Sequence, residues 1–301
     1  MRWDDFRRSD NIEDRRDSGP MASGGGMSMG GGGLGIGGLI IVGLISWALG
    51  IDPRILIGGL EMVQGPGSQQ QAPATPSKTG TPADQQGQFI AAVLGDSEDR
   101  WTEIFRQQYG RAYTPPRLVI FRGGTQSGCG FAQTAMGPFY CPRDQRVYLD
   151  TSFFNDLERR FNGCSGKACQ FSQAYVITHE VGHHVQNLLG ILPKVQEAQQ
   201  SMSDRDRNAL QVRVELQADC LAGVWANRSE QKWNFLEPGD IQAALQTASA
   251  IGDDRLQRQT QGYVVPDSFT HGSSAQRMQW FQAGFKNGLV SDCNTFGQGA
   301  I

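Results

Sequence analysis

The sequence has no long block of lysine or arginine, no Cys-x-x-C pair and only four histidines. Nucleic-acid binding usually shows as a clustered basic patch. The missing block and a formal net charge of −3 therefore argue against a nucleic-acid partner. Zinc ribbons typically use Cys-x-x-C pairs, so their absence argues against that kind of structural zinc site. Charge is also absent from one long stretch, because no charged residue lies between Asp17 and Asp52.

The uncharged stretch contains an apolar run at 34–51, LGIGGLIIVGLISWALGI. A helix needs roughly 17–25 such residues to span a bilayer, and Trp47 suits a membrane–water interface. A buried core helix and a cleaved signal peptide are the alternatives. Five arginines precede the run, whereas only Arg54 and Lys78 follow closely. The sequence thus predicts a single-pass anchor in the cytoplasmic (inner) membrane, with the amino terminus inside and the remainder periplasmic or extracellular.

Composition divides the chain into four parts. Residues 1–33 are charged and then glycine-rich, so they are predicted to form a disordered cytoplasmic segment. Residues 34–51 are the predicted transmembrane helix, and the Pro-, Gln- and Gly-rich residues 52–88 are interpreted as a linker. Residues 89–301 are long enough for one ordinary domain, and we expect them to form the folded part of the protein.

Inside this domain a few short β-type runs precede several helical patterns. The β-type runs are 118–121 and 139–149, and the helical patterns are 89–109, 170–189, 204–225 and 240–251. The predicted fold class is therefore α+β, with a small sheet.

All six cysteines lie within this domain. An even number in a folded part favours three disulfides in an oxidising compartment, and reduced buried thiols are the alternative. The sequence does not determine the pairing. We expect Cys129–Cys141, Cys164–Cys169 and Cys220–Cys293, since the first two are local.

The segment 179–183 reads His-Glu-Val-Gly-His, an HExxH motif inside an apolar-periodic run. Residues four apart share a helix face, so His179 and His183 can bind one ion, and Glu180 can reach a water beside it. A helix with two unrelated histidines is the alternative, but two of the four histidines fall at this spacing with Glu in the right position. His184 points roughly 100° away and is interpreted as a packing residue or a partner of a ligand.

Two histidines do not complete a catalytic zinc site, because zinc usually takes three protein ligands and leaves one position open. A metzincin would continue HxxGxxH, but Gln186 and Leu189 occupy the positions concerned. Glu215 on a later helix can complete a His₂Glu set for one zinc ion per chain. Asp219 lies four residues on, on the same face, where it can accept a hydrogen bond from a ligating imidazole.

This set predicts a zinc metalloendopeptidase acting on a peptide or protein substrate. Glu180 would be the general base, and His271 the donor that stabilises the oxyanion. Tyr263 and Arg277 are weaker candidates for the donor. A structural zinc site is normally closed by four ligands, which disfavours the alternative of a non-catalytic, membrane-tethered zinc-binding interaction protein. A cell-wall amidase would share the same chemistry.

The sequence resembles the bacterial family of putative neutral zinc metallopeptidases. The resemblance rests on HEVGHH at 179–184, ELQADCLAG at 215–223, HGSS at 271–274 with QR at 276–277, and GPFYCP at 137–142. It covers nearly the whole chain after the first charged segment. It implies a zincin-like fold with an amino-terminal membrane anchor. The ExxAD arrangement also resembles that of membrane-associated gluzincins, which supports Glu215 and Asp219 in their roles.

In zincins the substrate peptide usually lies along an edge strand above the motif helix. By this resemblance, the edge strand is expected at 147–150 or within 123–130.

Overall fold

The computed structural model of the chain describes residues 1–18, 77–133, 137–159 and 169–297. Its five-stranded sheet has the order β2-β1-β3-β7-β6. The strands are β1 (Ile12–Asp14), β2 (Lys78–Thr79), β3 (Arg117–Phe121), β6 (Phe139–Cys141) and β7 (Arg146–Asp150), with a separate hairpin of β4 (Gly124–Ser127) and β5 (Gly130–Gln133). β3 pairs parallel with β1 and β7, and the two outer pairs are antiparallel.

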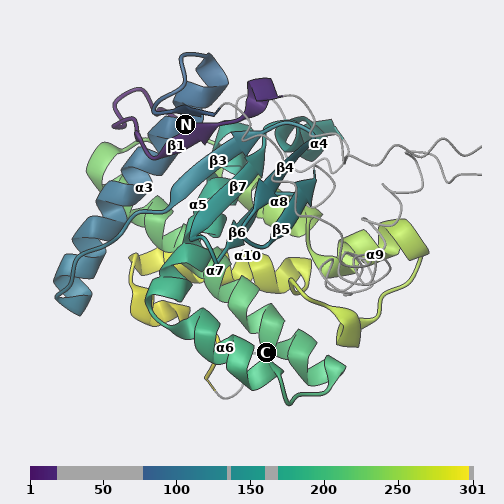
Figure 1. The fold of residues 1–301 in the computed structure, drawn as a ribbon. Coiled ribbons are helices and arrows are strands. Elements are labelled where there is room, and N and C mark those ends of the chain that lie inside the picture. The colour runs from purple at the N-terminus through teal and green to yellow at the C-terminus, as the bar shows by residue number, and fades with distance from the viewer. Residues whose placement is uncertain (19–76, 134–136, 160–168, 298–301) are drawn as a thin grey trace, which may run out of the picture.

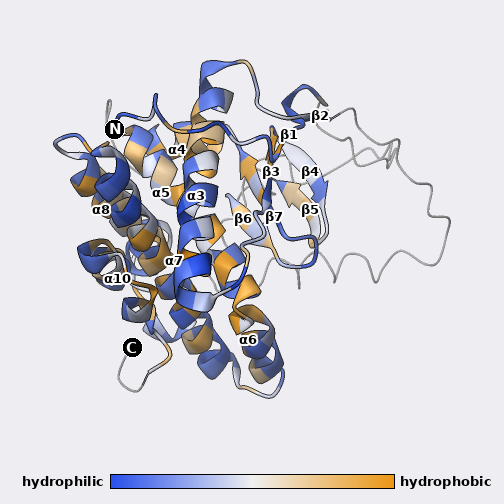
Figure 2. Ribbon diagram, turned by 90° about the vertical axis from the view of Figure 1, so that its left-hand side faces the viewer, coloured by the Kyte–Doolittle hydropathy of each residue, from blue (hydrophilic) through white to orange (hydrophobic). Residues whose placement is uncertain are grey.

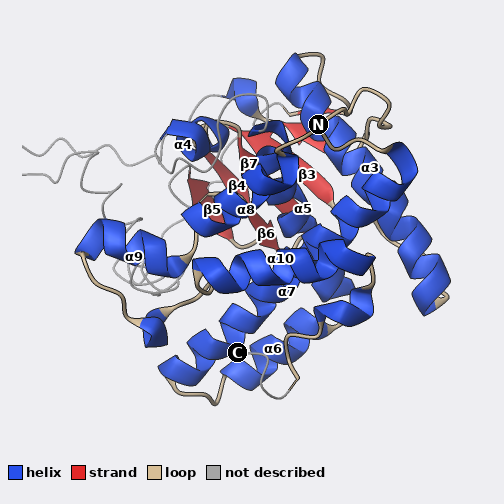
Figure 3. Cartoon of the chain, turned by 180° about the vertical axis from the view of Figure 1, so that it is seen from behind, coloured by secondary structure: helices blue, strands red, loops and turns tan. Residues whose placement is uncertain are grey.

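The helices lie mostly on one side of this sheet, some against its strands and others against neighbouring helices, as Figures 1 and 3 show from opposite sides. They are η1 (Arg16–Ser18), α3 (Gln85–Tyr109), α4 (Phe153–Arg159), α5 (Cys169–Leu188), α6 (Ile191–Gln199), α7 (Asp204–Trp233), α8 (Asp240–Ala250), α9 (Asp253–Gln261), η4 (Pro266–Ser268), α10 (Ser274–Asn287) and η5 (Val290–Cys293). In Figure 2 the helices are banded with hydrophobic and hydrophilic residues, as expected of amphipathic helices packed on a core. The predicted α+β class is confirmed.

Alternate residues of the central strands point to opposite faces of the sheet. On β3, Leu118 and Ile120 enter the main core, which also contains residues of α3, α5 and α7. Val119 and Phe121 enter a smaller cluster with Ala132 of the β4–β5 hairpin. The central strands are therefore buried on both faces, by helices on one side and by the hairpin on the other.

The amino-terminal residues 1–18 belong to this fold, so the prediction that they are disordered is wrong. Phe6 is 2% exposed and Ile12 is 1% exposed. The charges that suggested disorder have partners far along the chain. Arg7 forms ion pairs with Glu98 at 2.7 Å and with Asp99 at 2.9 Å. The amino-acid composition of a segment gives the number of its charges but does not show which distant residues form ion pairs with them.

The position of β1 also overturns the predicted membrane topology. β1 precedes residues 34–51 in sequence, yet it pairs with β2 and β3, which follow them. A single membrane crossing between these strands would place hydrogen-bonded partners on opposite sides of the bilayer. The predicted arrangement, with the amino terminus inside and the domain outside the membrane, is therefore wrong.

No helix within the described parts of the chain is long and apolar enough to cross a bilayer. The predicted transmembrane helix at 34–51 and most of the predicted linker at 52–88 lie outside the described residues. The end of that linker is ordered, because it contains β2 and the first turn of α3.

The helices α7 and α10 pack unusually closely. A Cβ added at Gly284 of α10 would collide with the carbonyl oxygen of Cys220, and one added at Gly223 of α7 would collide with the carbonyl of Phe281. Glycine at both positions permits this approach. The packing fixes α10, whose amino-terminal end follows the His271 loop, against the helix that carries Glu215.

Candidate metal centre

The motif helix α5 crosses α7 at a point where both have small residues. A Cβ added at Gly182 would lie 3.1 Å from the carbonyl oxygen of Ala218 and 3.4 Å from its Cβ. Such contacts are tighter than ordinary van der Waals packing, so a larger residue would push the helices apart. The close crossing places Glu215 of α7 opposite the two motif histidines of α5.

The structure brings His179, His183 and Glu215 together. One ligand atom from each lies within 4.8 Å of the others, and all three residues are buried. Glu215 Oε2 is 3.2 Å from His179 Nε2 and 3.4 Å from His183 Nε2. Two ligands bound at about 2.0–2.1 Å in a tetrahedral zinc site lie roughly 3.3 Å apart. The donor types and their separations therefore fit a zinc ion.

His179 is oriented by Asp219, whose Oδ1 lies 2.8 Å from Nδ1 and which is fully buried. With Nδ1 hydrogen-bonded, Nε2 of His179 is the nitrogen left to face Glu215 and a metal. The hydroxyl of Tyr175 donates to the same Asp219 oxygen at 2.5 Å. Arg277 Nε donates to Oδ2 at 2.8 Å and Nη2 donates to Oδ1 at 2.9 Å.

These partners keep Asp219 ionised. Burial alone would raise the pKa of Asp219, but the charges of Arg277 and His179 outweigh it and hold the pKa at about 2. Burial would likewise raise the pKa of Glu215, but the charge of His183 and the contacts with both histidines hold that pKa well below its ordinary value. Both carboxylates can therefore act as anions at neutral pH, as a metal ligand and its hydrogen-bonding partner must.

Glu180 is only 7% exposed. Burial raises the pKa of Glu180, the two histidines lower it and the neighbouring Glu215 raises it, with a net shift upward. A carboxyl with a raised pKa that is adjacent in sequence to a metal ligand has the properties expected of a general base.

His271 lies in the loop that leads into α10. The backbone N–H groups of Thr270, His271 and Gly272 donate to Oδ2 of Asp253 at 2.7, 2.6 and 3.1 Å. Oδ1 of Asp253 lies 3.4 Å from His271 Nδ1. Burial would lower the pKa of His271, but Asp253 outweighs it and raises that pKa. Asp253 was not predicted from the sequence, because no local pattern marks a carboxylate that binds a loop 17 to 19 residues later.

The charge of His271 acts on two carboxylates of the candidate site. The charge of His271 lowers the pKa of Glu180 and of Glu215. The two weaker donor candidates have other surroundings: Tyr263 is 62% exposed, and Arg277 is 2% exposed and bound to Asp219. Of the three, His271 is the one whose charge acts on Glu180.

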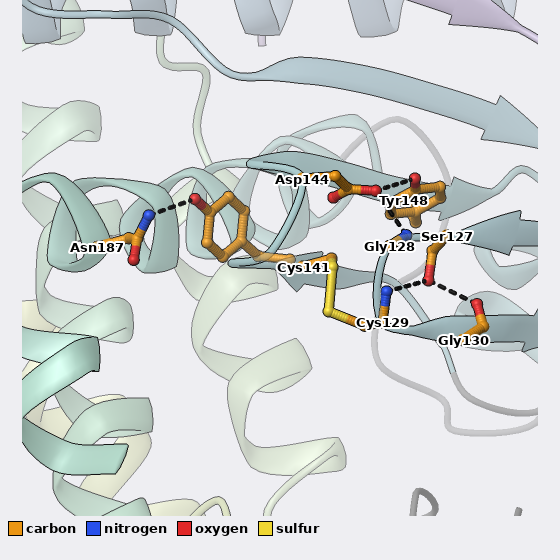
Figure 4. Close-up of a disulfide and its surroundings, with 9 residues drawn as sticks. Ser127, Gly128, Cys129, Gly130, Cys141, Asp144, Tyr148 and Asn187 are labelled. Atoms are coloured by element: carbon orange, nitrogen blue, oxygen red, sulfur yellow. Dashed lines mark hydrogen bonds between the residues drawn. A yellow bond between two sulfur atoms is a disulfide. The ribbon is translucent and has the colours of Figure 1, made fainter. Parts of the chain in front are cut away.

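His184 is buried and lies away from the ligand set. Its Nδ1 is 3.1 Å from the hydroxyl of Tyr140, and its Nε2 is 2.7 Å from the carbonyl oxygen of Thr114. Asn187, also on α5, donates to the same Tyr140 hydroxyl at 3.1 Å (Figure 4). His184 and Asn187 thus fasten β6 to the motif helix.

Among the described residues, β6 is the edge strand of the five-stranded sheet on this side, so the expectation of an edge strand at 147–150 was wrong. Residues 147–150 belong to β7, which pairs with β3 along its length and with β6 at 146–148. Residues 123–130 contribute to the two-stranded β4–β5 hairpin, where an edge strand for the substrate stays a prediction. A disulfide between Cys129 and Cys141 ties this hairpin to β6 (Figure 4). Within the described residues the outer edge of β6 is unpaired, and β6 is held in place by the hairpin and by α5.

Two of the three expected disulfides are confirmed, Cys129–Cys141 and Cys220–Cys293. Cys169 is disulfide-bonded, and Cys164, its expected partner, lies outside the described residues.

The chain was compared with known proteins. It is 49% identical over 300 residues to a protein of Escherichia coli (strain K12) called "Uncharacterized protein YpfJ", with 99% of each chain covered. It is 42% identical over 229 residues to "Uncharacterized protein Mb2605" of Mycobacterium bovis, which covers 73% of this chain and 74% of that protein. No solved structure was found to match.

The family described as "Putative neutral zinc metallopeptidase" matches residues 1–296. The match begins at residue 1, in agreement with the place of residues 1–18 in the sheet, and it includes every residue of the metal centre. The chain therefore belongs to the family of putative neutral zinc metallopeptidases.

Proposed function

We propose that this protein is a zinc-dependent endopeptidase that hydrolyses peptide bonds in a peptide or protein substrate. The observation that carries the proposal is the His179, His183 and Glu215 cluster, whose three donor atoms lie within 4.8 Å of one another beside the buried carboxyl of Glu180. A set of three ligands leaves the fourth position of a tetrahedral zinc site for water or substrate, which is typical of catalytic and not structural sites.

Zinc held by these residues would act as a Lewis acid and lower the pKa of a water molecule towards about 7. Glu180 supplies the base, since its carboxylate accepts a proton from the attacking water and later delivers it to the nitrogen of the departing amine. Its raised pKa favours the first step, because a carboxylate with a higher pKa is a stronger base towards the attacking water.

His271 is the proposed donor to the oxygen that becomes negative as water adds to the peptide carbonyl. The raised pKa of His271 favours its protonated form, in which both ring nitrogens carry hydrogen. Asp253 fixes the loop through three backbone hydrogen bonds, so the imidazole needs little reorganisation before the reaction.

The substrate backbone is proposed to pair, as an added strand, with the edge of β6 that has no partner strand among the described residues. A substrate strand beside the motif helix is the arrangement expected of a zincin-like active site. Tyr140 lies on β6 and is held by His184 and Asn187 of α5. An added strand would therefore have a fixed position relative to the metal ligands.

The test is hydrolysis of a diverse peptide mixture by the full-length, zinc-loaded protein. Glu180→Gln is the matched variant, and Glu197→Gln on the exposed face of α6 is its control. We expect the parent and the control to cleave, a chelator to stop both, and Glu180→Gln to retain one zinc per chain without turnover. Equal cleavage by parent and Glu180→Gln would refute the assigned base, and no cleavage by any zinc-loaded form would refute the endopeptidase.

A further inference from the structure

The nitrogen of His183 that faces away from the ligand cluster is Nδ1. It is hydrogen-bonded to an amide side chain, whereas Nδ1 of His179 is hydrogen-bonded to the carboxylate of Asp219. His183 Nδ1 lies 2.9 Å from Oε1 of Gln186, whose side chain is fully buried. Nε2 of Gln186 lies 2.7 Å from the carbonyl oxygen of Val214 and 3.0 Å from Oε1 of Gln217. Nε2 of Gln217 in turn lies 2.9 Å from the carbonyl oxygen of Cys293. We call His183, Gln186, Gln217 and Cys293 the amide relay.

The direction of every hydrogen bond in the amide relay follows from its last member. A backbone carbonyl can only accept, so Gln217 must turn its NH₂ group to Cys293 and its oxygen to Gln186. Gln186 then faces two acceptors, this oxygen and the carbonyl of Val214, so its own NH₂ must point to them. The remaining oxygen of Gln186 faces His183, which can satisfy it only with a proton on Nδ1.

That proton decides which histidine nitrogen is available for a metal. With hydrogen on Nδ1, the lone pair of a neutral imidazole lies on Nε2. Nε2 of His183 is the atom 3.4 Å from Glu215 Oε2, on the side of the ligand cluster. A carbonyl in the carboxyl-terminal turn thus selects the metal-binding tautomer of a ligand on a different helix.

The Cys293 carbonyl is itself held in place. Cys293 is 1% exposed and is joined by a disulfide to Cys220 of α7. Thr295, which is fully buried, donates its backbone N–H to the Cys293 carbonyl at 3.0 Å and its hydroxyl to the carbonyl of Arg213 at 2.7 Å. The end of the relay is therefore attached to α7, the helix that also carries Glu215.

We propose that Gln186 and Gln217 are positioning residues that, anchored on the Cys293 carbonyl, hold His183 in its metal-binding tautomer and so set the zinc affinity of the site. The inference rests on the metal site of the proposed function, but not on peptide hydrolysis. Partners of metal-ligating histidines typically change metal affinity by about 10–100-fold when removed. Gln217 gives the stricter test of the relay, because it contacts Gln186 and Cys293 and does not contact His183 directly.

The test measures zinc dissociation constants by competition with a chromogenic chelator, on the full-length protein. Gln186→Met and Gln217→Met remove the amides with little change in size, and Gln173→Met on α5, outside the relay, is the matched control. We expect a loss of about 10–100-fold for Gln186→Met, a smaller but clear loss for Gln217→Met, and parent affinity for the control. The double variant should lose no more than Gln186→Met alone, since both act through one contact.

A second measurement uses the parent protein alone and so does not depend on whether the variants fold. In the cadmium-loaded, ¹⁵N-labelled protein, coupling between metal and nitrogen identifies the ligating atom, which should be Nε2 of His183. Ligation through Nδ1, or a parent-like zinc affinity in folded Gln186→Met and Gln217→Met, would overturn the proposal. Weakened zinc binding in both variants of a parent that cleaves no peptide would leave the relay standing and refute only the endopeptidase.

Discussion

Arg277 of α10 and Asp219 of α7 form a buried two-point ion pair, in which Nε and Nη2 lie 2.8 and 2.9 Å from the two carboxylate oxygens. Their side chains are 3% and 0% exposed. The same carboxylate contacts His179 at 2.8 Å. The packing of α10 on α7 is therefore connected to the orientation of a metal ligand by a single carboxylate.

Removing the guanidinium should be costly. Arg277→Met leaves the Asp219 carboxylate buried with less compensating charge, and breaking a buried pair in this way typically costs about 3–5 kcal/mol. We expect a loss of that order in the free energy of unfolding of the metal-free protein, measured by denaturant titration. Arg255→Met on the exposed side of α9 should change it by less than about 0.5 kcal/mol. Similar small effects for both variants would contradict the role given to the ion pair.

The depressed pKa of Asp219 predicts a dependence of stability on acid. The folded-state pKa of about 2 lies below the ordinary value of 3.8, so the carboxylate contributes stability that is fully present above about pH 4. That contribution should be lost as the pH falls from about 4 to about 2. The metal-free parent should therefore exceed Asp219→Asn in stability at pH 6, and the difference should shrink over this window. A difference that stays constant down to pH 2 would show that the pKa is not depressed.

His271→Phe tests the proposed donor, because phenylalanine keeps a ring but has no N–H group to donate. Removal of one donor to a developing oxyanion typically lowers kcat by about 10²–10³-fold. We expect a loss of this size in kcat, a much smaller change in KM, and one zinc per chain as in the parent. Steady-state kinetics on a peptide that the parent cleaves, together with metal analysis, gives both readouts. Unchanged kcat in a fully zinc-loaded variant would remove His271 from the reaction.

Ile12→Ala tests whether the amino-terminal strand is part of the fold. Ile12 is 1% exposed in the main core, and truncating such a residue to alanine usually costs about 2–5 kcal/mol. We expect a loss in that range, measured as the free energy of unfolding. Asp5→Ala, in the same segment but exposed, is the control and should have little effect. If the segment were disordered, the two substitutions would be equally harmless.

The parts of the site that could be predicted from the sequence are those set by local geometry. Helical spacing alone places His179 beside His183 and Glu215 beside Asp219, and the structure brings the two pairs together. Sequence-local cysteines also gave Cys129–Cys141 correctly. These inferences needed only the periodicity of residues along a single helix or the short sequence separation of two cysteines.

The rest depends on contacts between distant segments. Arg277 was considered as an oxyanion donor, but its position 58 residues from Asp219 gave no sign that it would form a buried ion pair. The strand β1 was missed for a similar reason, because three residues among many charges carry almost no β-type pattern. The wrong membrane topology followed from that error, since the orientation rule was applied to a segment that in fact belongs to the sheet.

The place of β1 has a consequence for how the chain folds during its synthesis. Ile12 pairs with Leu118, so β1 must wait for its central partner, β3, until about a hundred further residues have been made. At about 5–20 residues per second this delay is on the order of 5–20 s. During that interval the sheet lacks its centre, so an assay of nascent chains should find protease resistance only after β3 and β7 have emerged.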